Sequence, residues 1–329
     1  MDFSSAEARF AVEAAQKAAL LVRRIQRDLA AEALTKNDRS PVTVADFAAQ
    51  AVVAAMLADA FPQEPLVAEE AAAALRSPDH AEVAAKVVSY VQTVFPQADA
   101  DTVLAWIDRG TAEAQGRFWV LDPIDGTKGF LRGDQYAVAL ALVEDGQVML
   151  GALACPNLRA AREPAKGGEG TLALAMRGQG ARWAALEAPT TWQALRVSDE
   201  RDPARARLLR SFESGHTNAG QIEAVAQALG TAAEPVRMDS QAKYAVLAAG
   251  GAEVYLRLLS PSKPDYREKI WDQAAGALIV EEAGGKVTDL DGKPLDFSTG
   301  RRLIANRGVL ATNGHLHAAV LDALRAVGA

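Results

Sequence analysis

The chain has 329 residues, of which 50% are hydrophobic and 23% are charged, so it can bury the core of two domains or of one large layered unit. Its formal net charge of -7 argues against a general nucleic-acid-binding surface, because such surfaces are usually basic. The single cysteine, Cys155, excludes an internal disulfide, and its apolar neighbours predict a buried thiol in a reducing compartment.

The first 60 residues predict two helices. Apolar residues recur at helical spacing from Phe10 to Ile25, which is typical of an amphipathic helix. A second helix is expected from about Asp46 to Ala60, after a polar turn and a short extended piece. The N-terminal segment lacks the order of a signal peptide, and no uncharged apolar run approaches about 18 residues. We therefore expect a soluble, cytoplasmic protein without a membrane partner.

The middle of the chain predicts helices followed by antiparallel strands. Residues 71–116 read mostly as helix and loop, and the apolar run 118–121 reads as a buried strand. Two hairpins follow, at 136–156 around Asp145-Gly146 and at 170–186 around two glycines. A polar, proline-bearing segment then predicts a boundary near residue 188, which divides the chain into an α+β domain (1–188) and a C-terminal α/β domain (189–329).

Beyond residue 188 the pattern changes to alternating strands and helices, which favours an α/β arrangement. The expected strands are 206–212, 235–239, 252–259 and 286–290, and the expected helices are 218–230, 241–251 and 271–285. Gly284 and Gly285 predict the end of the last of these helices.

The stretch LDPIDGTKGF places two acids in a turn at the end of the predicted strand. Pro123 and Gly126 turn the chain and leave Asp122 and Asp125 on one concave edge. Two carboxylates held that close repel unless a cation lies between them. An all-oxygen set that includes the Ile124 carbonyl suits magnesium better than zinc. A tight turn that happens to use Asp, Pro and Gly remains an alternative at this point.

Three further acidic positions have ordinary explanations when each is taken alone. The pair Glu69-Glu70 follows an apolar run and suits the start of a helix, where carboxylates are favoured. Asp46 and Asp272 each lie at or near the start of a predicted helix, where an N-cap role is sufficient.

Taken together and in order, these motifs resemble the lithium-sensitive, magnesium-dependent phosphatase superfamily that includes inositol monophosphatase and fructose-1,6-bisphosphatase. Four longer stretches, 35–50, 122–158, 239–258 and 266–292, look like 3'(2'),5'-bisphosphate nucleotidases. Inositol monophosphatases usually have a different run after Asp-Gly-Thr, without KGFLRGDQYA. The resemblance implies a layered α/β/α/β/α sandwich with the site between its two parts.

The resemblance also implies a role for each motif residue. The ligands of two or three Mg²⁺ ions would be Glu69, Asp122, the Ile124 carbonyl, Asp125 and Asp272. Asp46 and Thr127 resemble the dyad that positions and deprotonates the attacking water. The substrate contacts would be Thr127, His216, Ser240, Lys243, Arg257 and Asp272. Without the resemblance, Lys243 and Arg257 would read as surface charges, and His216 as a solvated loop residue.

The implied reaction is hydrolysis of the 3'-phosphate of adenosine 3',5'-bisphosphate to AMP and phosphate, in the context of sulfur assimilation. The partner would be a small-molecule nucleotide, and 3'-phosphoadenylyl sulfate is a candidate second substrate. The implied enzyme is inhibited by lithium and is a monomer or weak homo-oligomer. Two alternatives stay open: a phosphatase of inositol phosphates, and an inactive nucleotide or metal sensor that kept the fold.

Overall fold

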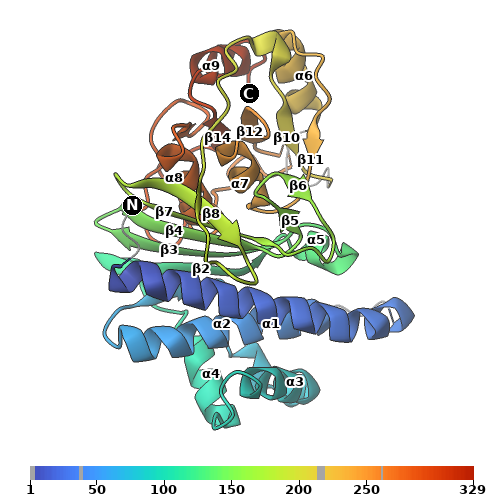
Figure 1. The fold of residues 1–329 in the computed structure, drawn as a ribbon, viewed down its shortest axis with the longest axis vertical. Coiled ribbons are helices and arrows are strands. Elements are labelled where there is room, and N and C mark those ends of the chain that lie inside the picture. The colour runs from blue at the N-terminus through green and yellow to red at the C-terminus, as the bar shows by residue number, and fades with distance from the viewer. Residues whose placement is uncertain (1–3, 37–39, 213–218, 261) are drawn as a thin grey trace.

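The computed structural model describes residues 4–36, 40–212, 219–260 and 262–329. In that part of the chain, helices and two main sheets stack in five layers: helices, sheet, helices, sheet, helices (Figure 1). The blue N-terminal helices form the first layer, and the orange and red C-terminal segments form the layers furthest from them. The predicted α/β/α/β/α sandwich is confirmed.

The first layer is built around two long helices, α1 (Ala6–Lys36) and α2 (Ser40–Ala60). α3 (Ala81–Gln92) and α4 (Ala100–Asp108) pack against α2. The segment expected to be extended before α2 is helical from Ser40 onward. Asp46 therefore lies inside α2, and its predicted N-cap role is wrong. Short 3₁₀ turns, η1 (Ala74–Arg76) and η2 (Pro78–His80), precede α3.

The second layer is a seven-stranded sheet within the described residues, with the strand order β1-β2-β3-β4-β7-β8-β9. Its strands are β1 (Leu66–Ala68), β2 (Arg117–Asp125), β3 (Ala137–Glu144), β4 (Gln147–Cys155), β7 (Thr171–Met176), β8 (Gly180–Ala185) and β9 (Gln193–Ala194). Both predicted hairpins are confirmed, and Asp145 and Gly146 turn the first one with positive φ angles of 49° and 77°. β5 (Leu158–Arg159) and β6 (Glu163–Pro164) form a separate small ribbon.

On β3, the two faces of this sheet carry side chains of different size. Leu140 and Leu142 of β3 point into the core shared with α1 and α2, whereas Ala141 points into the core shared with the next helical layer. On β4, a Cβ added to Gly151 would lie 2.6 Å from the Ala275 carbonyl oxygen. The absence of a side chain at Gly151 therefore lets α8 approach the backbone of β4 closely.

The remaining layers are contributed by the C-terminal part of the chain. The central helices are α7 (Ala242–Ala248) and α8 (Ala274–Glu282), and the outer ones are α6 (Ala219–Leu229) and α9 (His317–Ala326). Between them lies a sheet with the order β11-β10-β12-β14-β13, made of β10 (Leu208–Arg210), β11 (Val236–Arg237), β12 (Val254–Arg257), β13 (Lys286–Thr288) and β14 (Val309–Thr312). η3 (Pro203–Arg205) precedes β10. The division of the chain into two domains at residue 188 stays a prediction. β9 lies beyond this boundary but pairs with a strand of the first sheet.

One described helix, at Thr43–Ala60, is long and apolar enough to cross a membrane by length and composition. Within the fold, 72% of this stretch is buried. It packs against α1, α3 and α4, so its apolar character serves internal packing. Cys155 is also buried as predicted, and burial raises the pKa of its thiol.

We expect His317 to make the protein sensitive to acid. The imidazole is buried between Thr288 and Thr312, whose hydroxyl oxygens lie 3.0 and 2.9 Å from its nitrogens. Burial lowers its pKa from 6.5 to about 4. The unfolded chain therefore binds a proton that the folded one does not, and the stability contributed by neutral His317 is lost as pH falls from 6.5 towards 4.

Between pH 7 and about pH 4.5, the low pKa of His317 reduces the free energy of unfolding by about 2 kcal/mol. In urea unfolding at both pH values, His317→Gln should show a smaller loss of stability than the natural protein. His315→Gln is the matched control, because His315 is exposed. Parallel pH profiles for the natural protein and His317→Gln would contradict the assignment.

Candidate active site

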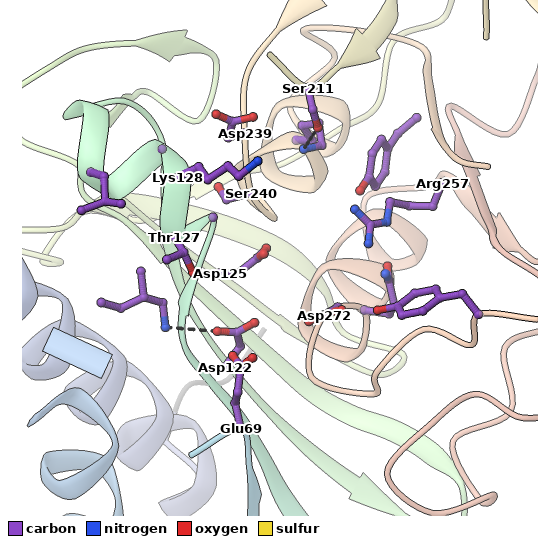
Figure 2. Close-up of a pocket in the computed structure, with 18 residues that line it drawn as sticks. Glu69, Asp122, Asp125, Thr127, Lys128, Ser211, Asp239, Ser240, Arg257 and Asp272 are labelled. Atoms are coloured by element: carbon purple, nitrogen blue, oxygen red, sulfur yellow. Dashed lines mark hydrogen bonds between the residues drawn. The ribbon is translucent and has the colours of Figure 1, made fainter. Parts of the chain in front are cut away.

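A cavity of about 460 Å³ opens at the ends of β1 and β2, beside α7, α8 and the short helix α5 (Thr127–Arg132) (Figure 2). It brings together most of the residues predicted from the sequence: Glu69, Asp122, Ile124, Asp125, Thr127, Ser240, Lys243, Arg257 and Asp272. Asp46 is not among the lining residues, and His216 lies outside the described residues.

Asp122 and Asp125 are placed by an irregularity at the end of β2. The strand continues through Pro123 to Asp125, so the chain turns at Gly126, as predicted, but not at Pro123. Opposite the neighbouring strand, the register shifts between Asp122 and Asp125, as in a β-bulge. The Ile124 amide donates to the Asp122 carboxylate at 3.1 Å, which fixes one of its oxygens within the bend. Both carboxylates line the cavity as a result.

Glu69 comes from the neighbouring strand. In the parallel pair of β1 and β2, Ala68 lies opposite Leu121, so the next residue of each strand, Glu69 and Asp122, emerge at the same sheet edge. The predicted helix start at Glu69 is wrong, because the pair follows a strand. Gln50 of α2, which the sequence did not single out, holds the Glu70 backbone through its carbonyl (2.7 Å) and its amide (3.0 Å).

These carboxylates raise one another's pKa. For Asp122, burial is the largest cause, followed by the charges of Glu69, Asp125 and others, and the pKa lies well above its ordinary value. Burial and then Asp125 do the same for Asp272. Glu69 is exposed as a residue, but the protein packed around its carboxyl group partly desolvates that group, and this desolvation, followed by the charges of Glu70 and Asp125, raises its pKa to about 7. Such a set is stabilised by a bound cation.

The donor set fits a hard divalent cation, because it consists of carboxylates and a backbone carbonyl. Among the described residues, no three His, Cys, Asp or Glu side chains lie close enough together to form a ready-made metal cluster. The acids therefore share the cavity without being arranged around a single point. Asp272 precedes α8, whose N-cap residue is Gln273, so the N-cap hypothesis for Asp272 is wrong.

Thr127 begins α5 directly after a left-handed glycine. Gly126 has a φ of 90°, and a Cβ there would lie 2.7 Å from the Ser240 side chain. Glycine is therefore required both by the conformation and by the close approach of the segment before α7. The Thr127 side chain is exposed and lines the cavity.

Asp46 is buried in α2 behind the cavity lining. Burial is the main cause that raises its pKa well above the ordinary value, and the charges of Glu70 and Glu69 contribute. The carboxyl group of Asp46 thus belongs electrostatically to the acidic set. Its pairing with Thr127 stays a prediction.

Two cationic side chains, Lys243 and Arg257, also line the cavity. Lys243 is 2% exposed, its Nζ lies 3.2 Å from the Ser211 hydroxyl, and burial lowers its pKa to about 8. Arg257 is paired with Glu268 at 3.0 Å, and its side chain is 19% exposed. The alternative of two surface charges is therefore wrong for both.

The cavity is also lined by residues that were not among the predicted site residues, including Lys128, Ser211, Asp239, Tyr255, Tyr266 and Gln273. Asp239 is paired with Arg132 of α5, and the adjacent Ser240 has a positive φ of 66°. Asp239 and Tyr255 lie within the family-like stretch 239–258, so that stretch held a signal for them. Ser211 begins the stretch 211–218, in which the resemblance also predicts His216, so this stretch held a signal as well.

Comparison with known proteins shows the family to which this chain belongs. The model of the inositol monophosphatase family matches residues 5–329. The 3'(2'),5'-bisphosphate nucleotidase of Schizosaccharomyces pombe is 41% identical over 98% of this chain and 96% of its own, and that of Oryza sativa is 42% identical over 98% and 94%. The solved inositol monophosphatase of Anabaena shares the fold, with a TM-score of 0.61 and 23% identity over 97% of this chain and 94% of its own. The chain therefore belongs to the inositol monophosphatase family and, within it, to the group of the 3'(2'),5'-bisphosphate nucleotidases.

Proposed function

We propose that this protein hydrolyses the 3'-phosphate of adenosine 3',5'-bisphosphate to give AMP and phosphate. The observation that carries the proposal is that one cavity contains both a set of carboxylates and two cationic side chains, Lys243 and Arg257; Figure 2 labels Arg257 and several of the carboxylates. A bisphosphate needs both, because one phosphate reacts where a divalent cation is held and the other needs an anion-binding group. The names of the relatives support the nucleotide as the substrate.

The family consists of metal-dependent phosphatases, and we propose Mg²⁺ as the metal, with two or three ions. The residues that would hold it are Glu69, Asp122, the Ile124 carbonyl, Asp125 and Asp272. Bound magnesium would neutralise phosphate charge and make water a better nucleophile near neutral pH. The all-oxygen chemistry of these donors and their mutually raised pKa values support this assignment.

Within the same proposal, Thr127 and Asp46 orient and deprotonate the attacking water. A threonine hydroxyl donates one hydrogen and accepts others, so it can accept from water while it donates to a carboxylate. The raised pKa of Asp46 favours its acceptance of a proton. Lys243 and Arg257 bind the 5'-phosphate, Ser240 assists them, and His216 contributes to nucleotide contacts. Asp272 lies beside the 3'-phosphate.

The remaining expectations are also proposals. We place the protein in the cytoplasm as a monomer or weak homo-oligomer, with no nucleic-acid or membrane partner. The net charge of -7 and the single buried cysteine support this view. The two-domain division at residue 188 belongs to the same set.

Phosphate release from several substrates, measured side by side with Mg²⁺, tests the proposal. We expect kcat/KM for adenosine 3',5'-bisphosphate to exceed that for inositol 1-phosphate by at least about 100-fold, because inositol 1-phosphate lacks a second phosphate for Lys243 and Arg257. 3'-Phosphoadenylyl sulfate should also be hydrolysed. Equal or better turnover of inositol 1-phosphate would favour the inositol phosphatase, and tight nucleotide binding without turnover would favour the sensor.

A further inference from the structure

The acidic side chains of the cavity come from two different parts of the fold. Glu69, Asp122 and Asp125 lie at the ends of two paired strands, and the pairing itself sets their spacing. Asp272 comes from the segment before α8, on the other side of the cavity, where Figure 2 shows it apart from the other three. Strand pairing does not place Asp272 relative to them. Other contacts must do so.

Gln241 provides one such contact. It is 2% exposed, and its backbone amide donates to the Asp125 carboxylate. Its side-chain amide donates to the carbonyl of Trp271 at 2.9 Å, and its side-chain oxygen accepts from the Gly276 amide in the first turn of α8 at 3.2 Å. One residue thus binds Asp125 directly and holds the chain on both sides of Asp272.

Arg301 provides the second contact, from the loop before β14. Its guanidinium donates to the carbonyls of Ala68 and of Gly110, the latter at 3.2 Å. Ala68 immediately precedes Glu69. The same guanidinium lies 4.8 Å from the centre of the Trp271 ring, in a cation–π contact. Arg301 therefore connects the strand that carries Glu69 to the residue that precedes Asp272.

Gln241 and Arg301 meet at Trp271, one at its carbonyl and the other at its ring. We propose that they are positioning residues, which set the place of Asp272 relative to Glu69 and Asp125 and thereby the affinity for a divalent cation. This inference rests on the metal-binding part of the proposed function. Residues that orient metal ligands commonly change metal affinity by about 10- to 100-fold when they are replaced.

The alternative is that both side chains only stabilise the fold. Asn306 offers a matched control for Gln241, since it is a buried carboxamide with three hydrogen bonds away from the cavity, to the Asp296 amide, the Asp289 carboxylate and the Pro294 carbonyl. Arg177 offers a control for Arg301, because it binds the Val148 carbonyl at 2.7 Å and Glu281 at 3.2 Å. Neither control lines the cavity.

The experiment counts free Mn²⁺ by electron paramagnetic resonance during titration of the intact protein, without nucleotide, and records the melting temperature of each variant. Gln241→Met and Arg301→Met should each raise the Kd for Mn²⁺ by about 10-fold or more. Asn306→Leu and Arg177→Met should lower the melting temperature and leave the Kd within about twofold. If Gln241→Met does not fold, Gln241→Glu keeps the acceptor for Gly276, loses the donor to Trp271, and should weaken Mn²⁺ binding in the same way.

Two results would overturn the proposal. One is an unchanged Kd in Gln241→Met and Arg301→Met, and the other is an equal loss of affinity in the two controls. Absence of Mn²⁺ binding by the natural protein would overturn it as well. Because no nucleotide is present, a protein that binds Mn²⁺ as expected but does not hydrolyse adenosine 3',5'-bisphosphate would contradict the proposed substrate and leave this inference standing.

Discussion

Asp122→Asn is expected to lower kcat/KM for phosphate release by about 1,000-fold or more and to stabilise the metal-free protein. Asp122 is 2% exposed, and after burial the causes that raise its pKa are all carboxylates: Glu69, Asp125, Asp272 and Asp46. Asparagine removes this repulsion and keeps an oxygen to accept from the Ile124 amide. The gain in unfolding free energy without metal should be about 1 to 2 kcal/mol.

The measurement combines initial rates at saturating Mg²⁺ with urea unfolding in a chelator. Asp289→Asn is the matched control, because Asp289 is fully buried away from the cavity and accepts from the amides of Asp291 and Lys293 at 3.0 and 2.9 Å. That variant should lose stability and keep its activity. A loss of stability in metal-free Asp122→Asn would mean that Asp122 serves the fold and does not oppose it.

Lys243→Met is expected to lower kcat/KM to different extents for two substrates that differ only in the 5'-phosphate. We expect kcat/KM for adenosine 3',5'-bisphosphate to fall by about 100-fold, because truncation of a buried charge partner costs about 2 to 5 kcal/mol. For 3'-AMP, which lacks that phosphate, the fall should be much smaller. Methionine fills the space of the buried side chain, which limits damage to packing.

The ratio of the two kcat/KM values is the diagnostic quantity. Lys243 also lowers the pKa of Asp125, so its loss disturbs the carboxylates of the cavity, but it does so for both substrates. The kcat/KM for adenosine 3',5'-bisphosphate divided by that for 3'-AMP should therefore fall towards the value expected when no side chain binds the 5'-phosphate. An equal loss for both substrates would place the 5'-phosphate away from Lys243.

The elements of the layered fold could be predicted where their signal comes from residues that are close together in the sequence. The two apolar runs of β3 and β4, with a turn at Asp145-Gly146 between them, are a signal from neighbours in sequence, and this hairpin was predicted correctly. The start of α2 was misplaced even though Ser40-Pro41 is a recognised way to begin a helix. β14 and α9 were not predicted, because their positions depend on packing against segments far away in the chain.

The site was predictable as a list of residues and much less so as an arrangement. Asp122 and Asp125 share one short motif, and both line the cavity. Charged residues are usually exposed, so the sequence alone favoured a surface position for Lys243, and its burial beside Ser211 came only from the structure. Gln241 lies in the family-like stretch 239–258, but its contacts, like those of Arg301, were not predicted, because they join segments that are distant in sequence.

The unequal faces of the first sheet also bear on how such a sequence can diverge. On the side of Leu140 and Leu142, one aliphatic residue can replace another if the total volume is kept, so many neutral steps are available. Towards α8, a single methyl group on Gly151 would meet the backbone of Ala275. Backbone cannot repack as a side chain does. Random drift should therefore replace Leu140 and Leu142 by other aliphatic residues long before it replaces Gly151.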